Sequence, residues 1–461
     1  MIPVQLSVLA AELNAAGLKA ELIGEDNVIN ALSSDTRQLG SGALFVALKG
    51  ERFDGHDFAE QALANGASAL LVERQLDLPL PQLIVSHTQK AMGAIGAYVK
   101  RQVAPKSVAL TGSNGKTSVK EMVATILSQS HRVLYTAGNF NNEIGVPLTL
   151  LRLESQHEFG VFELGANHMG EIDYTSSLVK PDVAMVNNVA SAHLEGFGSL
   201  AGVAKAKSEI FNHLSTEGVA VINLDDDFAS VMQSAAAPHK QLSFSANGQT
   251  ADVTASELSA DLVGRYRFTL SYQGQDFTVQ LPLAGRHQVS NALAASTICL
   301  ALGLTLEEIV AGLHKLTPVK GRMLPTELGR ILLIDDSYNA NPASVGAAID
   351  WLQEIKGNRC LVLGDLGELG DNASLLHRQL GEKARLQGID ALFSLGTLSR
   401  HSSEGFSGQH HDDFDELIVD LIEFINQLSG NVTVLVKGSR SARMERVVEA
   451  LIAAFERKEL C

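Results

Sequence analysis

The stretch from Ser107 to Ser118 most constrains what this chain can fold into. A short apolar run leads into the polar segment T-G-S-N-G, and the residues after it place Val119, Met122 and Val123 on one face of a helical pattern. This order predicts a strand, a phosphate-binding loop and a helix, because backbone N–H groups at a helix N-terminus attract anions. The residues of the predicted loop are Thr111, Gly112, Ser113, Asn114, Gly115, Lys116, Thr117 and Ser118.

Lys116 and Thr117 give this loop its chemistry. A lysine at this position neutralises the outer phosphates of a nucleotide, and a threonine hydroxyl ligates Mg²⁺. The common phosphate-loop pattern has a glycine five residues before the Gly-Lys pair, where this chain has Leu110. The alternative is a plain glycine turn between strand and helix, which the Lys-Thr pair disfavours.

Length and charge limit the class of protein. A chain of 461 residues is too long for one ordinary core and favours about three domains. The net charge of −16 disfavours a nucleic-acid partner, which needs a basic face. The 3 cysteines have no Cys-x-x-Cys spacing, so we expect neither disulfides nor zinc and a reducing, cytoplasmic location. The apolar runs are too short for a membrane span, so we expect no membrane partner.

The order of apolar runs predicts an α/β fold in three units. Residues 1–84 are expected to form a small first unit, and residues 85–317 a central unit with a mostly parallel sheet around the phosphate loop. Strand and helix patterns alternate again in residues 318–461. Polar–apolar alternation over residues 251–282, with a turn at Gln273–Gly274, predicts a small antiparallel insertion.

Polar residues follow several of the predicted strands and form the candidate site, because ligands bind at the carboxyl ends of parallel strands. Glu163 ends a strand after the phosphate loop, where nucleotide-hydrolysing folds place the acid that holds Mg²⁺. An exposed carboxylate at a strand end is the alternative. His193 also follows a strand end and could serve a second Mg²⁺, although a single histidine is more often structural. Residues 335–339 and 437–440 are expected along one sheet edge of the third unit.

Lys207 poses an electrostatic problem for a metal site. An ammonium about 4 Å from Mg²⁺ would be repelled by about 8 kcal/mol at an effective dielectric constant of about 20. Either this side chain points away from the metal, as on a solvated helix, or it is chemically modified to an anion. The sequence leaves both alternatives open.

Two further loops are candidates for binding substrate. Asn139, Asn141 and Asn142 can donate and accept hydrogen bonds, which suits phosphate oxygens or an amide substrate. A structural turn cluster is nearly as compatible with this pattern. In the first unit, the residues that could together hold a phosphate are Ser34, Thr36 and Arg37. A turn with a solvated arginine fits that stretch equally well.

Taken together, these motifs resemble the Mur ligases of bacterial cell-wall synthesis over essentially the whole chain. The matching wording is T-G-S-N-G-K-T-S, G-N-F-N-N-E-I-G-V-P-L-T-L-L, E-L-G-A-N-H-M-G-E-I and D-D-S-Y-N-A-N-P. The family's phosphate loop lacks the distant first glycine, so Leu110 fits the resemblance. The member that adds diaminopimelate carries an Asp-Asn-Pro-Arg motif, whereas residues 371–374 here read D-N-A-S, which favours the member that adds a dipeptide.

The resemblance implies an ATP-dependent ligase with three domains. Residues 1–84 would bind the UDP end of the substrate, residues 85–317 would bind ATP, and residues 318–461 would form a Rossmann-like domain that closes over the nucleotide. The enzyme would be a monomer that joins D-alanyl-D-alanine to UDP-N-acetylmuramoyl-tripeptide through an acyl phosphate. The implied cofactors are ATP and two Mg²⁺ ions.

The resemblance also implies roles for single residues. Catalysis is assigned to Lys116, Lys207 and His193. The metal ligands would be Thr117, Glu163, His193 and Lys207, the last as a carbamate that removes its positive charge. Beyond the phosphate loop, the contacts to ATP would be Asn291, Arg322 and Asp336. The implied substrate contacts are Ser34, Thr36, Arg37, Asn139, Asn141 and Asn142.

Two alternative functions remain at this point. A folylpolyglutamate-type ligase shares a related phosphate loop and a similar lysine, but the loop from Ser34 to Arg37 fits it poorly. A nucleotide-dependent binding protein without ligase chemistry is the second alternative. ATP binding without substrate-dependent ADP release would favour the binding protein.

Overall fold

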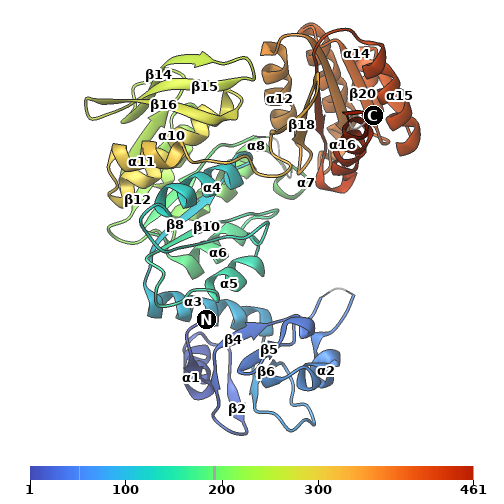
Figure 1. Cartoon of the computed structure of the whole chain (residues 1–461). Coiled ribbons are helices and arrows are strands. Elements are labelled where there is room, and N and C mark those ends of the chain that lie inside the picture. The colour runs from blue at the N-terminus through green and yellow to red at the C-terminus, as the bar shows by residue number, and fades with distance from the viewer. Residues whose placement is uncertain (51, 191–193, 460–461) are drawn as a thin grey trace.

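The computed structural model describes residues 1–50, 52–190 and 194–459. Within these residues the strands form three larger sheets and one two-stranded ribbon. The sheets follow one another along the chain, from the blue N-terminal part to the red C-terminal part in Figure 1. The predicted α/β class with mostly parallel sheets is confirmed. Of the helices described, none combines the length and apolar character needed to cross a membrane.

The N-terminal sheet has the strand order β2-β7-β6-β5-β4. Its strands are β2 (Glu21–Ile23), β4 (Ala31–Ser33), β5 (Ala43–Val46), β6 (Ala67–Val72) and β7 (Gln82–Ile84), and the ribbon pairs β1 (Val4–Gln5) with β3 (Val28–Ile29). The α-helices of this part are α1 (Leu6–Ala15) and α2 (Ala59–Ala64). Leu6, Leu9 and Leu13 recur at helical spacing and are fully buried, because α1 packs on α3 of the next unit.

The central sheet has the strand order β16-β15-β14-β13-β12-β11-β8-β10-β9. These strands are β8 (Lys106–Thr111), β9 (Val133–Tyr135), β10 (Phe159–Glu163), β11 (Val183–Val186), β12 (Val219–Asn223), β13 (Lys240–Ser245), β14 (Val253–Ala260), β15 (Arg265–Tyr272) and β16 (Gln275–Ala284). The helices are α3 (Thr88–Val103), α4 (Lys116–Leu127), α5 (Gly145–Leu150), α6 (Glu171–Val179), α7 (Leu194–Phe197), α8 (Leu200–Ser208), α9 (Ala229–Ala235), α10 (His287–Leu302) and α11 (Leu306–Leu313). β8 lies between β11 and β10 and runs parallel to both, so the carboxyl ends of these three strands lie at the same edge of the sheet.

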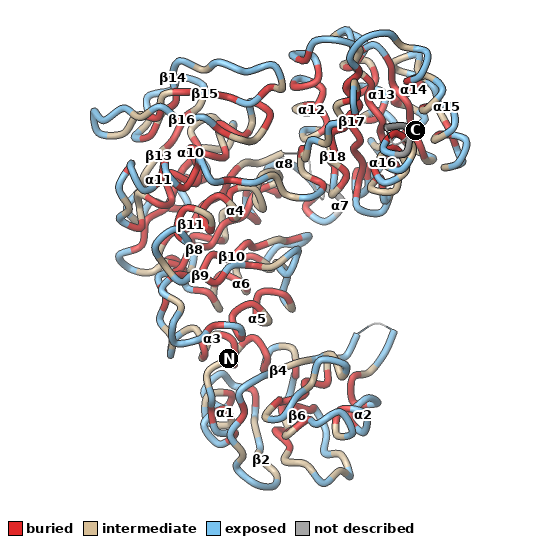
Figure 2. The backbone as a smooth tube through the Cα atoms, viewed as in Figure 1, coloured by how far each residue is buried: buried red, intermediate tan, exposed pale blue. Residues whose placement is uncertain are grey.

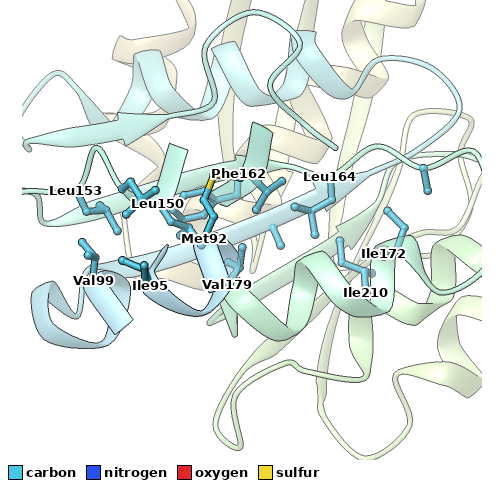
Figure 3. Packing of buried hydrophobic residues seen from close by; sticks show 14 of the residues in the cluster. Met92, Ile95, Val99, Leu150, Leu153, Phe162, Leu164, Ile172, Val179 and Ile210 are labelled. Atoms are coloured by element: carbon cyan, nitrogen blue, oxygen red, sulfur yellow. The ribbon is translucent and has the colours of Figure 1, made fainter. Parts of the chain in front are cut away.

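Helices cover both faces of the central sheet, and the burial of the layers is evident in Figure 2. Alternate residues of β8 point to opposite faces, so Ala109 packs with α3 while Val108 and Leu110 pack with α4 and α10. Figure 3 shows Met92 and Ile95 of α3 packed among residues of α5 and β10. Burial on both sides explains why these strands read as continuous apolar runs.

The antiparallel segment is correctly predicted as antiparallel, but it is not a separate insertion. β14, β15 and β16 extend the central sheet beyond β13. The turn between β15 and β16 has positive φ at both Gln273 and Gly274, the conformation that matches the twist of a two-residue hairpin. Tyr266 of β15 donates a 2.9 Å hydrogen bond to Glu354, so this end of the sheet braces the C-terminal part.

The C-terminal sheet has the strand order β17-β18-β22-β19-β20-β21, with only the β17–β18 pair antiparallel among its described strands. Its strands are β17 (Leu324–Leu328), β18 (Ile331–Asp336), β19 (Asn358–Gly364), β20 (Ala391–Leu395), β21 (Gln409–His411) and β22 (Val432–Lys437). Its helices are α12 (Pro342–Glu354), α13 (Ala373–Leu386), α14 (Arg400–Phe406), α15 (Phe414–Gln427) and α16 (Glu445–Glu459). α12 and α13 cover one face, and α15 and α16 cover the other.

Two glycines in the helices that pack on one face of this sheet give a matched test of the packing. A Cβ at Gly381 in α13 would lie 1.9 Å from the carbonyl oxygen of Ser402, whereas a Cβ at Gly346 in α12 would meet only the flexible end of Lys383, at 3.3 Å. We expect Gly381→Ala to lower the free energy of unfolding by about 1–3 kcal/mol. Gly346→Ala is expected to leave it unchanged or to raise it by up to about 1 kcal/mol, because alanine favours helix. Equal denaturation midpoints for the two variants would contradict this packing.

Candidate active site

A cavity of about 620 Å³ lies where the carboxyl ends of β8, β10 and β18 meet. It brings together most of the site residues predicted from the sequence. Those that line it are Ser113, Asn114, Gly115, Lys116, Thr117, Ser118, Asn139, Asn141, Asn142, Glu163, Lys207, Asn291, Arg322 and Asp336. Thr111 and Gly112 belong to the same loop but are buried and do not line the cavity. His193 lies outside the described residues.

The loop after β8 is hydrogen-bonded to the segment after β11. The Asn114 N–H donates a 2.8 Å hydrogen bond to the Asn188 side chain, and the Ser113 N–H donates a 2.9 Å bond to the Asn188 carbonyl. Gly115 precedes α4 with a φ of 77°, and a Cβ there would lie 2.4 Å from the amide nitrogen of Asn187. A glycine is therefore required at this position.

Lys116 folds back over its own loop. Its Nζ donates hydrogen bonds to the carbonyl oxygens of Gly112, at 2.6 Å, and Ser113, at 3.4 Å. Burial lowers the pKa of Lys116, and the nearby Glu163 carboxylate opposes that shift. The ammonium is thus held at the loop where a phosphate would be bound, with backbone carbonyls as its present partners.

Thr117 and Glu163 form a pair of oxygen donors beside Lys116. The Thr117 hydroxyl donates a 2.9 Å hydrogen bond to one oxygen of Glu163, and Asn141 donates a 2.9 Å bond to the other. In the part of the chain that the structure describes, no cluster of three or more His, Cys, Asp or Glu side chains could hold a metal. Mg²⁺ usually takes one or two protein oxygens and completes its shell with phosphates and water, so this donor set fits Mg²⁺.

Lys207 lies on α8 with only 2% of its surface exposed. Burial lowers the pKa of Lys207 well below its ordinary value, and repulsion from Lys116 acts in the same direction. The alternative of a solvated helix lysine is therefore wrong. The amine is driven towards its neutral form, which is the form that can add carbon dioxide.

The C-terminal part reaches the phosphate loop through two side chains. The Arg322 guanidinium donates a 2.9 Å hydrogen bond to the Thr117 hydroxyl and lies 4.4 Å from the centroid of the Tyr338 ring. Asn341, which caps α12, donates a 2.8 Å bond to the Asn114 side chain. The cavity is therefore built from both parts of the chain.

Comparisons with known proteins identify the family. Three family models match this chain. The model described as "Mur ligase family, catalytic domain" matches residues 28–129, and the model described as "Mur ligase middle domain" matches residues 110–299. The model described as "Mur ligase, glutamate ligase domain" matches residues 321–440. A relative from Escherichia coli (strain K12) is 51% identical over 98% of this chain and 99% of its own length. The chain belongs to the Mur ligase family. That relative is named UDP-N-acetylmuramoyl-tripeptide--D-alanyl-D-alanine ligase.

Solved Mur ligase structures share the fold of the whole chain. MurF from Acinetobacter baumannii is 40% identical with a TM-score of 0.92, and the match covers 96% of this chain and 98% of that one. MurF ligase from Thermotoga maritima, in complex with ADP, is 29% identical with a TM-score of 0.84 over 93% of this chain and 98% of that one. The resemblance to the Mur ligases is confirmed.

In this Mur ligase, Asn291 belongs to a chain of buried amides. The amide nitrogen of Asn187 donates to the Asn114 carbonyl at 2.9 Å and to the Asn291 side-chain oxygen at 3.2 Å. Asn291 then donates a 3.1 Å bond to the side-chain oxygen of Gln288. Because the backbone carbonyl of Asn114 can only accept, the orientation of each amide follows from the one before it. In this series of hydrogen bonds the side-chain oxygen of Gln288 accepts, so its side-chain nitrogen is left as a donor at the cavity wall.

The amide-rich loop has structural bonds as well as cavity exposure. Asn142 accepts backbone N–H bonds from Ile144 and Gly145 at the start of α5, at 3.3 and 2.8 Å. Asn141 is held by Glu163, while Asn139 is exposed at the cavity. The turn-cluster alternative therefore describes part of this loop, and Asn139 is its freest amide for a ligand.

Ser34, Thr36 and Arg37, which were predicted to contact the UDP end of the substrate, lie in the N-terminal part and are not among the described residues that line this cavity. The Arg37 guanidinium is 82% exposed and pairs with Asp35 at 2.8 Å. The hydrogen bond that the Arg37 side chain donates to Asp35 is the main cause that lowers the pKa of Asp35 to about 2. Binding a phosphate would require Arg37 to share or exchange this carboxylate partner.

The sequence analysis expected Lys437 along a sheet edge of the third unit, but it assigned no role to Lys437 or to two other polar residues near the phosphate loop. Lys437 forms an ion pair with Asp336, so the carboxylate predicted to contact ATP also fixes a buried cation. Asn188 and Asn341 support the phosphate loop from two distant segments. Their positions after strand ends were the only signal in the sequence. That they contact the phosphate loop could be seen only in the folded structure.

Proposed function

We propose that this Mur ligase is an ATP-dependent enzyme that joins D-alanyl-D-alanine to UDP-N-acetylmuramoyl-tripeptide and forms the UDP-muramoyl-pentapeptide precursor of peptidoglycan. The observation that carries the proposal is the 51% identity to the Escherichia coli relative over 98% of the chain. The cavity supports it, because a phosphate loop, a pair of oxygen donors and cations from two parts of the chain meet there. ATP is supported by the ADP complex of the Thermotoga maritima neighbour.

The chemistry follows from the weakness of a carboxylate as an electrophile. The terminal carboxylate of the tripeptide attacks the γ-phosphorus of ATP, which forms an acyl phosphate and releases ADP. The amine of D-alanyl-D-alanine then attacks the acyl carbon, loses a proton and expels inorganic phosphate. Lys116 and Arg322 stabilise the negative charge that moves between the phosphates and the acyl group. Mg²⁺, held by Thr117 and Glu163, would supply charge neutralisation at the phosphates.

We further propose a division of labour among the parts of the chain. Residues 1–84 bind the UDP end of the substrate through Ser34, Thr36 and Arg37, residues 85–317 bind ATP, and residues 318–461 form the domain that closes over it. Asn291 and Asp336 contact the adenosine, while the amides of the Gly138–Gly145 loop face the peptide. Closure would exclude water from the acyl phosphate. The enzyme acts in this proposal as a cytoplasmic monomer.

Lys207 is proposed to act as a carbamate. A neutral amine adds carbon dioxide and loses a proton, which converts an uncharged group into an anion next to the metal site. The burial of Lys207 and its lowered pKa support this step. His193 is proposed as a further metal-site residue on the resemblance alone. The carbamate would place an anion where an ammonium about 4 Å from Mg²⁺ would be repelled by about 8 kcal/mol.

The folylpolyglutamate-type alternative and the binding-protein alternative are not favoured, because relatives matched over 98% and 94% of this chain are both named UDP-N-acetylmuramoyl-tripeptide--D-alanyl-D-alanine ligase. The test measures phosphate release from ATP by the purified protein with both substrates present, and then with each omitted in turn. Release that requires both substrates, with the pentapeptide product identified by mass, supports the proposal. Release that is independent of both, or activity with folates instead, contradicts it.

A further inference from the structure

Lys120 is a fully buried lysine that the mechanism above does not use. It lies on α4, one helical turn after Lys116, with 0% of its surface exposed. Its Nζ donates a 2.8 Å hydrogen bond to the carbonyl oxygen of Thr136 and forms a 2.8 Å ion pair with Glu121. It also lies 5.6 Å from the centroid of the Tyr135 ring. A buried charge with this many partners is held in one place.

Thr136 connects this lysine to the strand that carries the metal-site carboxylate. Its own N–H donates a 3.1 Å bond to the Val161 carbonyl, which continues the β9–β10 pairing by one residue. Its hydroxyl, itself fully buried, accepts a 3.0 Å bond from the N–H of Glu163. The end of β10 is therefore fixed through Thr136 at the residue that bears the carboxylate.

The position of the Glu163 side chain is also fixed by residues of α4 and of the segment after β9. One of its oxygens accepts from Thr117, which lies on α4 three residues before Lys120, and the other accepts from Asn141, which lies five residues after Thr136. Lys120 thus ties the helix and the loop together on either side of this carboxylate. We infer that Lys120 is a positioning residue that, through Thr136, sets where the Glu163 carboxylate stands relative to Thr117.

A lysine suits this task for a physical reason. A bond from an ammonium to a carbonyl is charge-assisted and shorter than a neutral one, so it fixes the position of Thr136 more tightly. Loss of the ammonium leaves a buried carbonyl without its donor, and the segment after β9 would shift to find another. Such a shift moves the hydroxyl that holds the Glu163 N–H. The expected consequence is a weaker metal site in a folded protein.

The test compares two disrupting variants with two matched controls in the full-length protein. Lys120→Met removes the ammonium, and Thr136→Val removes the hydroxyl that accepts from Glu163. Thr136→Ser keeps that hydroxyl. Lys100→Met removes a lysine that also donates to a backbone carbonyl, that of Lys180 at 3.2 Å, but far from the site in α3.

The readout is Mn²⁺ binding in the presence of saturating ADP, followed by electron paramagnetic resonance, which needs no turnover. Partners of metal ligands typically change metal affinity by about 10- to 100-fold, so we expect the Mn²⁺ dissociation constant to rise about tenfold or more in both disrupting variants. Both controls should match the wild type, and ADP affinity without metal should be unchanged in all four. Lys120→Met combined with Thr136→Val should weaken Mn²⁺ binding by less than the product of the single effects.

The inference rests on the proposed function only in taking Thr117 and Glu163 as the metal-holding pair. Wild-type protein that does not bind Mn²⁺ with ADP would contradict the proposed function itself. Normal Mn²⁺ binding by wild type and by both disrupting variants would overturn the inference alone, even if their melting temperatures fall. If Lys120→Met does not fold, Thr136→Val against Thr136→Ser decides, and equal Mn²⁺ affinities for that pair overturn the inference.

Discussion

Lys116→Met is expected to reduce ADP formation by about 10³-fold or more while the protein stays folded. The ammonium is held by carbonyl oxygens of its own loop and stands beside Thr117 and Glu163, where the transferred phosphoryl group would bear its charge. Removing one preorganised group of this kind typically costs about 10²- to 10³-fold, and an outer-phosphate lysine acts on both nucleotide binding and transfer. The measurement is single-turnover ADP release with both substrates at saturation.

The matched control for this variant is Lys106→Met. Lys106 lies at the opposite end of β8 and its Nζ is 3.5 Å from the Leu302 carbonyl, well away from the cavity. Its replacement should leave ADP release within about twofold of the wild type. Circular dichroism spectra of both variants should overlay that of the wild type. Near-normal turnover by Lys116→Met would refute the assignment of this loop as the phosphate site.

The second large effect is expected at Lys207. Lys207→Ala should lower the turnover number by about 10²-fold or more, because the anion proposed for the metal site is lost. Lys207→Glu should retain more activity than Lys207→Gln, since glutamate supplies a carboxylate near the same place. Lowering the pH favours the protonated amine, so the carbamate and the activity that depends on it should decline as the pH falls towards the lowered pKa of Lys207 and below it.

The direct measurement for Lys207 is a ¹³C NMR spectrum of the protein equilibrated with ¹³C-bicarbonate. A carbamate signal should appear in the wild type and be absent from Lys207→Ala. Lys205→Ala is the matched control, because Lys205 lies on the same helix but is exposed. A wild-type protein without the signal whose activity is independent of bicarbonate would refute the carbamate.

The parts of the fold that the sequence predicted are those with a strong local pattern. The phosphate loop combines an apolar strand, a glycine with positive φ at Gly115 and a helix whose apolar face, Val119 to Leu127, is buried. The same reasoning placed Glu163 and Asp336 at strand ends, and both line the cavity. Sheet edges gather such residues whatever the distance between them in sequence.

The parts that the sequence did not predict depend on contacts between distant segments. Arg322 was expected at the nucleotide only from the family resemblance, and no local pattern encodes the bonds by which Arg322 and Asn341 reach the loop across more than 200 positions. Lys120 is different, because it shares a helical face with Val123 and Leu127 and could have been recognised as buried. Because a lysine in a helix is usually solvated, the burial of Lys120 was not predicted. The antiparallel strands were read as an insertion because local alternation does not show which sheet they join.

The most direct test of the central claim follows the oxygen atoms of the tripeptide carboxylate. UDP-N-acetylmuramoyl-tripeptide labelled with ¹⁸O in its terminal carboxylate is incubated with ATP, Mg²⁺, D-alanyl-D-alanine and the enzyme in unlabelled water, and the inorganic phosphate is analysed by mass. If the carboxylate is phosphorylated and then attacked by the amine, each phosphate released carries one carboxylate oxygen, and one ¹⁸O remains in the new amide. Phosphate without ¹⁸O would mean that ATP is hydrolysed by water, and it would contradict the acyl-phosphate ligase described here.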